Sequence, residues 1–502
     1  MAGEIYALGR LVGAAWVLIR ADALLPEALD PYLPPSGKAA ARLLRLFRGK
    51  PARVGRPGER LALALEGLGP AAIKLGQLLS TRADIFGEEF AQDLARLKDQ
   101  LEPFPPEQAK AEVARALGRP LDSLFSEFGP AIAGASLAQA HPARLLDGRK
   151  VAVKILRPGV EQRIRSDIGA MILAARIAEG LGASARRLEP RALAATVARS
   201  LELELDLRLE AAGASELGEV MARDPYMRAP EVIWDGVAKR VLTLAWAEGE
   251  PLSSPAALEQ PGLDRPALAI QLTRAFLAQA LDHGVFHADL HEGNLFAAPP
   301  DRLMAVDFGI MGRLGPAERR YLAEILWGFL ERDDLRVAKV HFQAGYVPEH
   351  HSVEAFAQAI RAVGEPIFGH GAAEVSMGRV LTQLFEITAL FDMRLRPELV
   401  LLQKTMVTVE GVSRRIDPAH DIWAAANPVV RRWITRELSP PARLQRLAED
   451  GLNVLEGLAR HALAPVPGPV VAPAPRPSRL AWLALGLAIA GLAVAIAAFW
   501  RR

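Results

Sequence analysis

The chain has 502 residues, more than one domain usually holds, so two or more folded units are expected. Its 60 Lys and Arg residues nearly balance its 58 Asp and Glu residues, which gives no reason to expect nucleic acid as a partner. There is no cysteine, which excludes a disulfide framework and thiolate metal sites.

The first predicted element is a helix near the N-terminus. Apolar residues over 8–19 form one broad stripe, which indicates an interfacial or packing helix. A signal peptide ending at residues 21–23 is the alternative, but Arg20 fits poorly just before that cleavage site. Pro, Gly and Arg dominate residues 30–58, which we interpret as a linker with one short basic helix.

The next part of the chain changes from helical to strand patterning. Helical periodicity covers about residues 60–117, with a break at Gly69-Pro70. Small residues at 133–136 form a tight segment, and Asp147-Gly148 marks a hairpin turn. An apolar strand that contains one lysine follows at residues 151–155.

Helices predominate in the rest of the chain. They are predicted for residues 160–220, as two helices with one break near 180–182, and a short strand follows at 240–246. Helical pattern resumes at 266–283, a polar cluster occupies 287–307, and further helices extend to about residue 461.

The C-terminal stretch predicts a membrane span. Residues 480–500 carry no charge, and about 21 residues at roughly 1.5 Å each cross a hydrocarbon core of about 30 Å. Trp482 and Trp500 lie near its ends, as interfacial aromatics do. A buried core helix is the alternative. Arginines lie on both sides, so the positive-inside rule sets no orientation.

The polar cluster has the spacing of a kinase-type nucleotide site. Such sites use an Asp that orients the acceptor, an Asn five residues later that holds magnesium, and an Asp-Phe-Gly whose Asp bridges metal and phosphates. Asp289 and Asn294 have this spacing, and Asp307-Phe308-Gly309 follows a short apolar strand. This combination predicts a site for ATP and Mg²⁺.

Lys154 is the lysine inside the apolar strand. A buried ammonium needs an anionic partner, and phosphate oxygens together with a helix glutamate meet that need in kinases. The plainer interpretation is a lysine that extends to solvent from an edge strand. The partner is expected on the helical segment 202–216, where spacing alone leaves three acidic residues open: Glu204, Asp206 and Glu210.

His287 and His291 flank Asp289 and raise an alternative. A His-x-Asp-x-His cluster can hold the metal of a hydrolase. That hypothesis leaves Lys154 and Asp307 unexplained, so we expect His287 instead to pack and hydrogen-bond in support of the catalytic loop.

Two kinase motifs are missing. No G-x-G-x-x-G precedes the lysine strand, and no Ala-Pro-Glu follows Asp307-Phe308-Gly309. Without an activation segment a peptide-docking groove is hard to build, so ordinary protein phosphorylation is not expected.

With these departures, the chain resembles the UbiB family of atypical kinase-like proteins over roughly residues 60–435. Lys74-Leu75-Gly76-Gln77 is similar to the family's K-x-G-Q helix, and Glu204-Leu205-Asp206 to its E-x-D motif. Residues 287–294 resemble the family catalytic loop, and residues 401–411 its C-terminal lobe. The small-residue segment corresponds to the family's nucleotide loop, which consists of Ala133, Gly134, Ala135 and Ser136.

The resemblance implies roles for particular residues. Glu210 falls where the family places the glutamate that pairs with the strand lysine, which makes Lys154, Glu210 and Asp289 the expected catalytic set. Lys74 and Gln77 would lie over the active site, with Lys74 near Glu204. Asn294 and Asp307 would hold Mg²⁺. The family is associated with ATPase activity coupled to lipidic quinone precursors at a membrane.

We therefore expect an α+β, two-lobed protein-kinase-like fold with an N-terminal helical extension and a C-terminal transmembrane helix. The expected parts are an N-terminal helix and linker (1–58), a K-x-G-Q extension (60–127), an N-terminal lobe (128–250), a C-terminal lobe (251–461), a Pro/Ala tether (462–479) and a membrane span (480–500).

The expected function is a membrane-anchored ATPase-like kinase of ubiquinone biosynthesis, with its kinase-like domain on the cytoplasmic side of the inner membrane. Expected partners are ATP, membrane lipids, quinone precursors and enzymes of that pathway. A nucleotide-binding pseudokinase scaffold and a lipid or phenol kinase are the alternatives.

Overall fold

The computed structural model describes residues 2–23, 35–47, 55–80, 87–95, 97, 102–180, 189–369, 387, 390–393 and 397–438. The chain divides into two compact units, Met1–Thr435 and Arg436–Arg502, and the elements that build the site belong to the first. The predicted tether and membrane span lie outside the described residues. Among the helices that are described, none combines the length and apolarity that a membrane crossing requires.

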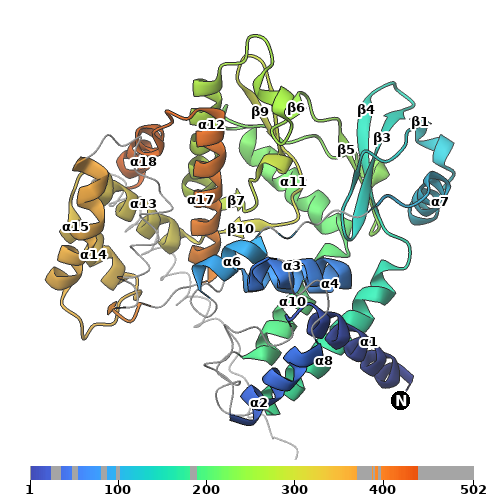
Figure 1. Cartoon of the computed structure of the whole chain (residues 1–502). Coiled ribbons are helices and arrows are strands. Elements are labelled where there is room, and N and C mark those ends of the chain that lie inside the picture. Colours follow the sequence, from blue (N-terminus) through green and yellow to red (C-terminus); the bar gives the residue numbers. More distant parts are fainter. Residues whose placement is uncertain are drawn as a thin grey trace, which may run out of the picture. The chain divides into compact units, whose positions relative to one another are not determined.

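An antiparallel sheet of five strands forms the first layer (Figure 1). The order is β1-β3-β4-β5, and β2 pairs with β3. The strands are β1 (Phe125–Phe128), β2 (Ala133–Gly134), β3 (Ala138–Leu145), β4 (Lys150–Leu156) and β5 (Val241–Ala245). The hairpin predicted at Asp147-Gly148 is confirmed, because it joins β3 to β4.

One face of this sheet packs against helix α7 (Pro106–Leu117). Val151, Val153 and Ile155 of β4 are fully buried in a core that also contains Ala109 and Val113 of α7. Side chains alternate between the faces of a strand, so the next position along β4 points away from α7. That alternation sets Lys154 on the opposite face.

The N-terminal helices form a separate core around α3. They are α1 (Ala2–Arg20), α3 (Pro57–Leu68), α4 (Pro70–Leu79) and α6 (Glu88–Ala95), while α2 (Pro35–Leu44) contributes none of its described residues to this core. The predicted break at Gly69-Pro70 is confirmed: Gly69 has a φ of 105°, which a residue with a side chain rarely adopts. Gly76 of the K-x-G-Q helix lies where a Cβ would overlap Leu97 and Leu65, so close packing explains this glycine.

Three helices follow β4, where two had been predicted. They are α8 (Val160–Gly180), α10 (Pro190–Glu204) and α11 (Leu207–Met221). The prediction that Glu204, Asp206 and Glu210 share one helix is wrong. Asp206 instead caps α11 by accepting a hydrogen bond from the Arg208 backbone, so Glu204 ends one helix and Glu210 begins the next.

The segments that carry the predicted site residues Asp289, Asn294 and Asp307 lie between short strands. A two-stranded sheet pairs β7 (Val285–His287) with β10 (Met311–Arg313), and a three-stranded sheet has the order β6 (Glu250–Pro251), β8 (Leu295–Ala298), β9 (Arg302–Ala305). The remaining helices are α12 (Arg265–Ala278), α13 (Pro316–Leu330), α14 (Asp334–Gln343), α15 (Val353–Gly369), α17 (Pro397–Ile416) and α18 (Ile422–Leu438). Helix α17 packs along α12 (Figure 1).

Candidate nucleotide site

Lys154 joins the two parts of the predicted site. Its Nζ donates to both carboxylate oxygens of Glu210, at 2.8 and 2.9 Å, and lies 3.4 Å from Asp307 Oδ2. Strand β4 supplies the lysine, the first turn of α11 supplies Glu210, and the turn after β9 supplies Asp307. Of the three acidic candidates for the partner, the structure brings Glu210 to the lysine.

Burial and charge act against each other in this triad. Burial lowers the pKa of Lys154, but attraction to Asp307 and Glu210 outweighs it and raises that pKa above the usual value. Burial raises the pKa of Glu210 to about 7, although Lys154 opposes the shift. The Lys154 ammonium lowers the pKa of Asp307. The Asp307 side chain is 49% exposed, so a charged carboxylate remains accessible to a ligand.

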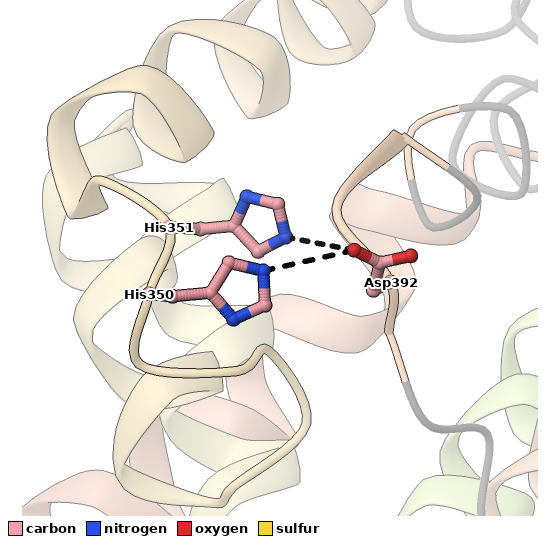
Figure 2. Close-up of side chains that lie close together, drawn as sticks. All are labelled: His350, His351 and Asp392. Atoms are coloured by element: carbon pink, nitrogen blue, oxygen red, sulfur yellow. Dashed lines mark hydrogen bonds and ion pairs between the residues drawn. The ribbon is translucent and has the colours of Figure 1, made fainter.

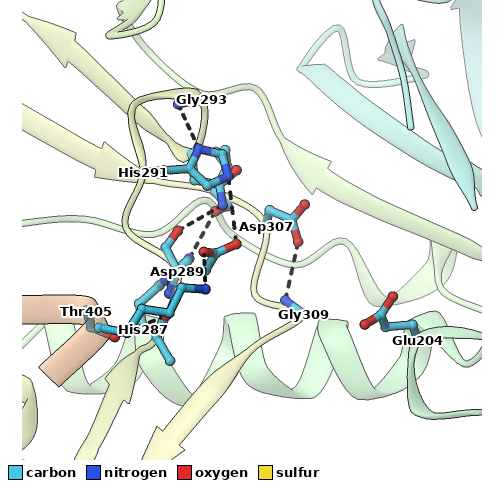
Figure 3. A network of polar contacts seen from close by, with 12 residues as sticks. Glu204, His287, Asp289, His291, Gly293, Asp307, Gly309 and Thr405 are labelled. Atoms are coloured by element: carbon cyan, nitrogen blue, oxygen red, sulfur yellow. Dashed lines mark hydrogen bonds and ion pairs between the residues drawn. The ribbon is translucent and has the colours of Figure 1, made fainter. Parts of the chain in front are cut away.

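The turn that carries Asp307 is held in an uncommon backbone conformation. Asp307 has a φ of 62°, and its Oδ1 accepts a hydrogen bond from the Gly309 backbone at 3.3 Å (Figure 3). Such a side-chain turn is one way in which Asp tolerates left-handed φ. Gly213 of α11 helps to position the turn, because a Cβ there would come within 3.2 Å of the Phe308 carbonyl oxygen.

The loop after β7 positions Asp289 and Asn294. Asn294 is buried, and its Nδ2 donates to the Asp289 carbonyl oxygen at 3.0 Å, which leaves its Oδ1 for another partner. The Asn294 carbonyl accepts from the Val306 backbone at 2.9 Å, so the loop is tied to the residue just before Asp307. His291 Nε2 lies 3.7 Å from Asp289 Oδ2 (Figure 3).

His287 supports this loop from inside the protein. It is fully buried, its Nδ1 accepts from the Asp289 backbone at 3.1 Å, and its Nε2 therefore carries the hydrogen donated to the Val306 carbonyl, also at 3.1 Å. Burial lowers its pKa and keeps the ring neutral. Both nitrogens are used, so the hypothesis of a His287–His291 metal site loses one ligand.

Helix α17 contributes residues that the sequence reasoning did not assign to the site. Lys404 Nζ lies 3.8 Å from Asp289 Oδ1, and Thr405 donates to the Ala288 carbonyl oxygen at 3.1 Å. Arg415 of the same helix forms an ion pair with Glu292 of the loop. The only sequence signal for Lys404 was its place in the segment that resembles the family's C-terminal lobe.

The small-residue segment forms a tight hairpin at the edge of the sheet. Ala133 and Gly134 pair with β3, and the Ala135 backbone donates to the Ala138 carbonyl at 2.8 Å. Arg157 holds this turn by donating from its Nε to the Ala135 carbonyl at 2.9 Å. Ser136, at the end of this segment, is buried.

The K-x-G-Q helix reaches the site through an ion pair. Lys74 of α4 pairs with Glu204 at the end of α10, as the resemblance implied. The charge on Glu204 contributes to the raised pKa of Glu210, so the two acidic residues lie within each other's electrostatic range. Gln77 is half-buried one turn after Lys74, and its carbonyl accepts from the Ser80 hydroxyl at 2.6 Å.

The donor set fits a magnesium ion. Mg²⁺ prefers oxygen ligands from one or two side chains together with phosphate oxygens and water. Asp307 offers an exposed carboxylate, and Asn294 offers the amide oxygen that its own hydrogen bond leaves available. The neighbouring Asp289 and Glu210 add negative charge that favours a cation.

Two family models match this chain. The ABC1 atypical kinase-like domain matches residues 96–341, which include the sheet, the Lys154–Glu210 pair and the catalytic loop. The UbiB helical domain matches residues 360–421, which include α17 with Lys404 and Thr405. The first matched region thus contains Asp289 and its loop, and the second contains the two α17 residues next to that loop.

Curated relatives share most of the chain. A probable protein kinase UbiB from Marinobacter nauticus is 39% identical over 449 residues, which are 88% of this chain and 81% of the relative. A probable protein kinase UbiB from Xylella fastidiosa is 38% identical over 437 residues, 84% of this chain and 79% of the relative.

A solved structure has a similar fold. It is the complex of Rv3197 with erythromycin from Mycobacterium tuberculosis, with a TM-score of 0.51 and 21% sequence identity. The similarity covers 78% of this chain and 95% of that chain, and it concerns the fold alone.

Proposed function

The chain belongs to the UbiB family of ABC1 atypical kinase-like proteins, and from this premise we propose that it hydrolyses Mg-ATP at a membrane in support of ubiquinone biosynthesis. The observation that carries the proposal is the triad in which Lys154 contacts Glu210 at 2.8 Å and Asp307 at 3.4 Å. This is the pairing by which kinase-like proteins orient the lysine that binds nucleotide phosphates.

Each residue has a task in this mechanism. Lys154, oriented by Glu210, binds the α- and β-phosphates of ATP as a charged donor. Asp307 and Asn294 would hold Mg²⁺, which would supply positive charge to offset the negative charge that develops on the transferred phosphate. Asp289 orients the attacking hydroxyl or water, and Lys404, 3.8 Å away, offsets its negative charge.

The acceptor is proposed to be water or a small molecule and not a protein. Helix α10 ends in Glu204, and the ion pair with Lys74 attaches the K-x-G-Q helix to that end. No Ala-Pro-Glu follows Asp307-Phe308-Gly309 to build a peptide-docking groove. These features favour ATP hydrolysis coupled to a quinone precursor or to a partner enzyme.

Association with a membrane has two supports. The predicted span at 480–500 is one. The other is the segment of α2 and the turn after it, where Leu43, Leu46 and Phe47 are 62%, 77% and 60% exposed. Arg42 lies in the same segment and is exposed, and exposed apolar and basic side chains together are typical of helices that bind the membrane interface.

Quinone profiling tests the pathway. A strain lacking the gene is complemented with the wild-type protein, with Asp307→Asn or with the control Glu216→Gln, which removes a surface carboxylate paired with Arg313. We expect deletion to lower ubiquinone, and wild type and Glu216→Gln to restore it, whereas Asp307→Asn does not. Normal ubiquinone in the deletion strain would contradict the pathway assignment and leave the nucleotide site untouched.

A further inference from the structure

Two histidines and an aspartate meet on a surface that the nucleotide site does not use. His350 and His351 lie in the turn between α14 and α15, and Asp392 lies in the described segment 390–393 that precedes α17 in the sequence (Figure 2). Both Nε2 atoms point to the same carboxylate oxygen, at 3.7 Å from His350 and 3.2 Å from His351.

Aromatic packing holds the three side chains in place. The ring of Phe391 lies 5.3 Å from that of His351 and 5.0 Å from that of Phe356, which is fully buried in α15. The Phe391 backbone also donates to the Ile387 carbonyl at 3.1 Å. The ring contacts hold the residue next to Asp392 against α15 and against His351 itself, so the carboxylate is positioned before any ligand binds.

The spacing matches the coordination shell of a small transition-metal ion. Two ligand atoms that are each about 2.1 Å from a tetrahedral Zn²⁺ lie about 3.4 Å from each other. The two nitrogen–oxygen distances, 3.2 and 3.7 Å, bracket this value, and the three ligand atoms all lie within 4.8 Å of one another. Imidazole and carboxylate are ligands that Zn²⁺ accepts, with water in the remaining position.

We propose that His350, His351 and Asp392 form a Zn²⁺ site that joins the α14–α15 turn to the segment 390–393. A hydrogen bond between His351 and Asp392 alone would explain the position of only one of the two histidines. His351 donates to Asp392 at 3.2 Å, but His350 is beyond hydrogen-bond distance and is still directed at the same oxygen. The exposure of His350 and Asp392, 67% and 69% for their side chains, gives the ion and its water access to the site.

The site is chemically distinct from the magnesium site. Asp307 and Asn294 offer only oxygen ligands, which suit Mg²⁺, whereas two imidazole nitrogens select Zn²⁺ over Mg²⁺. Its expected effect is structural: a bound ion crosslinks two segments of the folded chain and stabilises the fold by mass action. Asp392 lies within the matched UbiB helical domain, and the histidines lie before it.

The test is a Zn²⁺ titration of the full chain, without an affinity tag, in lipid nanodiscs and without ATP, which would compete for the ion. Calorimetry gives the affinity, and the visible absorption of added Co²⁺ reports imidazole coordination. We expect one saturable Zn²⁺ per chain and a rise in unfolding temperature on binding. Asp392→Asn and His350→Gln should each weaken binding at least about tenfold.

Glu354→Gln is the matched control. Glu354 is an exposed carboxylate at the start of α15 that bonds to Ser352 and lies outside the trio, so this variant removes one nearby charge and no ligand. Its affinity for Zn²⁺ should equal that of the wild type. His350 and Asp392 are exposed, so their variants are expected to fold, and circular dichroism checks this. Absence of saturable binding, or equal affinity in all four proteins, would overturn the proposal.

Discussion

Glu210→Gln changes the site by one charge while it preserves the shape of the side chain. Lys154 now donates to both oxygens of a carboxylate that is 9% exposed, at 2.8 and 2.9 Å; the variant removes its charge and leaves a single neutral amide oxygen as acceptor. The lysine keeps Asp307 at 3.4 Å as its anionic neighbour. We expect it to move toward Asp307 and to compete for the carboxylate that is proposed to bind magnesium.

The magnitude follows from the energy of a charged hydrogen bond in a buried site. Removing such a bond costs roughly 1.5–3 kcal/mol. Each 1.36 kcal/mol corresponds to about a tenfold change in rate, so kcat/KM for ATP hydrolysis should fall roughly 10- to 100-fold.

The assay is phosphate release from Mg-ATP by the full chain in nanodiscs. Glu216→Gln is the matched control, since it changes a carboxylate on the same helix whose partner is the surface residue Arg313. Its kcat/KM should stay within about twofold of the wild type, because exposed ion pairs contribute little. A Glu210→Gln protein with native thermal unfolding and an unchanged kcat/KM would refute the reasoning.

Four further predictions rest on the same geometry. Burial raises the pKa of Glu210 to about 7, and protonation removes the anion that orients Lys154. The value of kcat/KM should therefore be constant above pH 7 and fall about tenfold per pH unit below it. A pH profile of kcat/KM checks this, and Glu210→Gln should lack the decline. Lys404→Met should lower kcat roughly fivefold with little change in KM, in steady-state kinetics, because its charge lies 3.8 Å from Asp289. Lys74→Met should lower the free energy of unfolding by about 1 kcal/mol in urea, because the partner carboxylate stays partly buried. Gly76→Val should lower it by about 2 kcal/mol, since the added side chain overlaps two packed leucines.

For the last three variants, the contradicting outcomes are specific. A wild-type kcat for Lys404→Met would remove that residue from the site. Unchanged urea midpoints for Lys74→Met or Gly76→Val would mean that the contacts of α4 do not contribute to stability.

Local patterns account for the parts of the site that could be predicted. Lys154 stands in a run of β-branched residues with period two, and Asp289, Asn294 and Asp307 have fixed spacings that do not depend on distant packing. The partner Glu210 was different, because spacing left three acidic residues open and only the family resemblance selected one.

The sequence carries a helix-start signal just before Glu210, and the periodicity-based prediction does not include it. Asp206 is a preferred helix-capping residue, and its backbone is extended where α11 begins. The single helical segment predicted over 202–216 runs through this boundary, so it does not contain the break. Capping chemistry, and not hydrophobic periodicity, separates the two helices.

Lys404 and Asp392 could not be assigned from sequence patterns. Lys404 approaches Asp289 because α17 packs along α12, and the neighbouring Thr405–Ala288 bond spans 117 positions. The His350–His351–Asp392 trio likewise depends on aromatic packing between segments that are far apart in sequence. Neither arrangement has a local spacing that single-sequence reasoning can detect.

The most direct test of the account is ATP hydrolysis by the wild type and by Asp307→Asn, each as the full chain in nanodiscs with and without Mg²⁺. We predict Mg²⁺-dependent hydrolysis by the wild type and a rate at least about 100-fold lower for the variant, because the substitution removes the charge expected to hold the metal. Nucleotide binding without any wild-type hydrolysis would favour a scaffold. Hydrolysis by Asp307→Asn at the wild-type rate would contradict the proposed site.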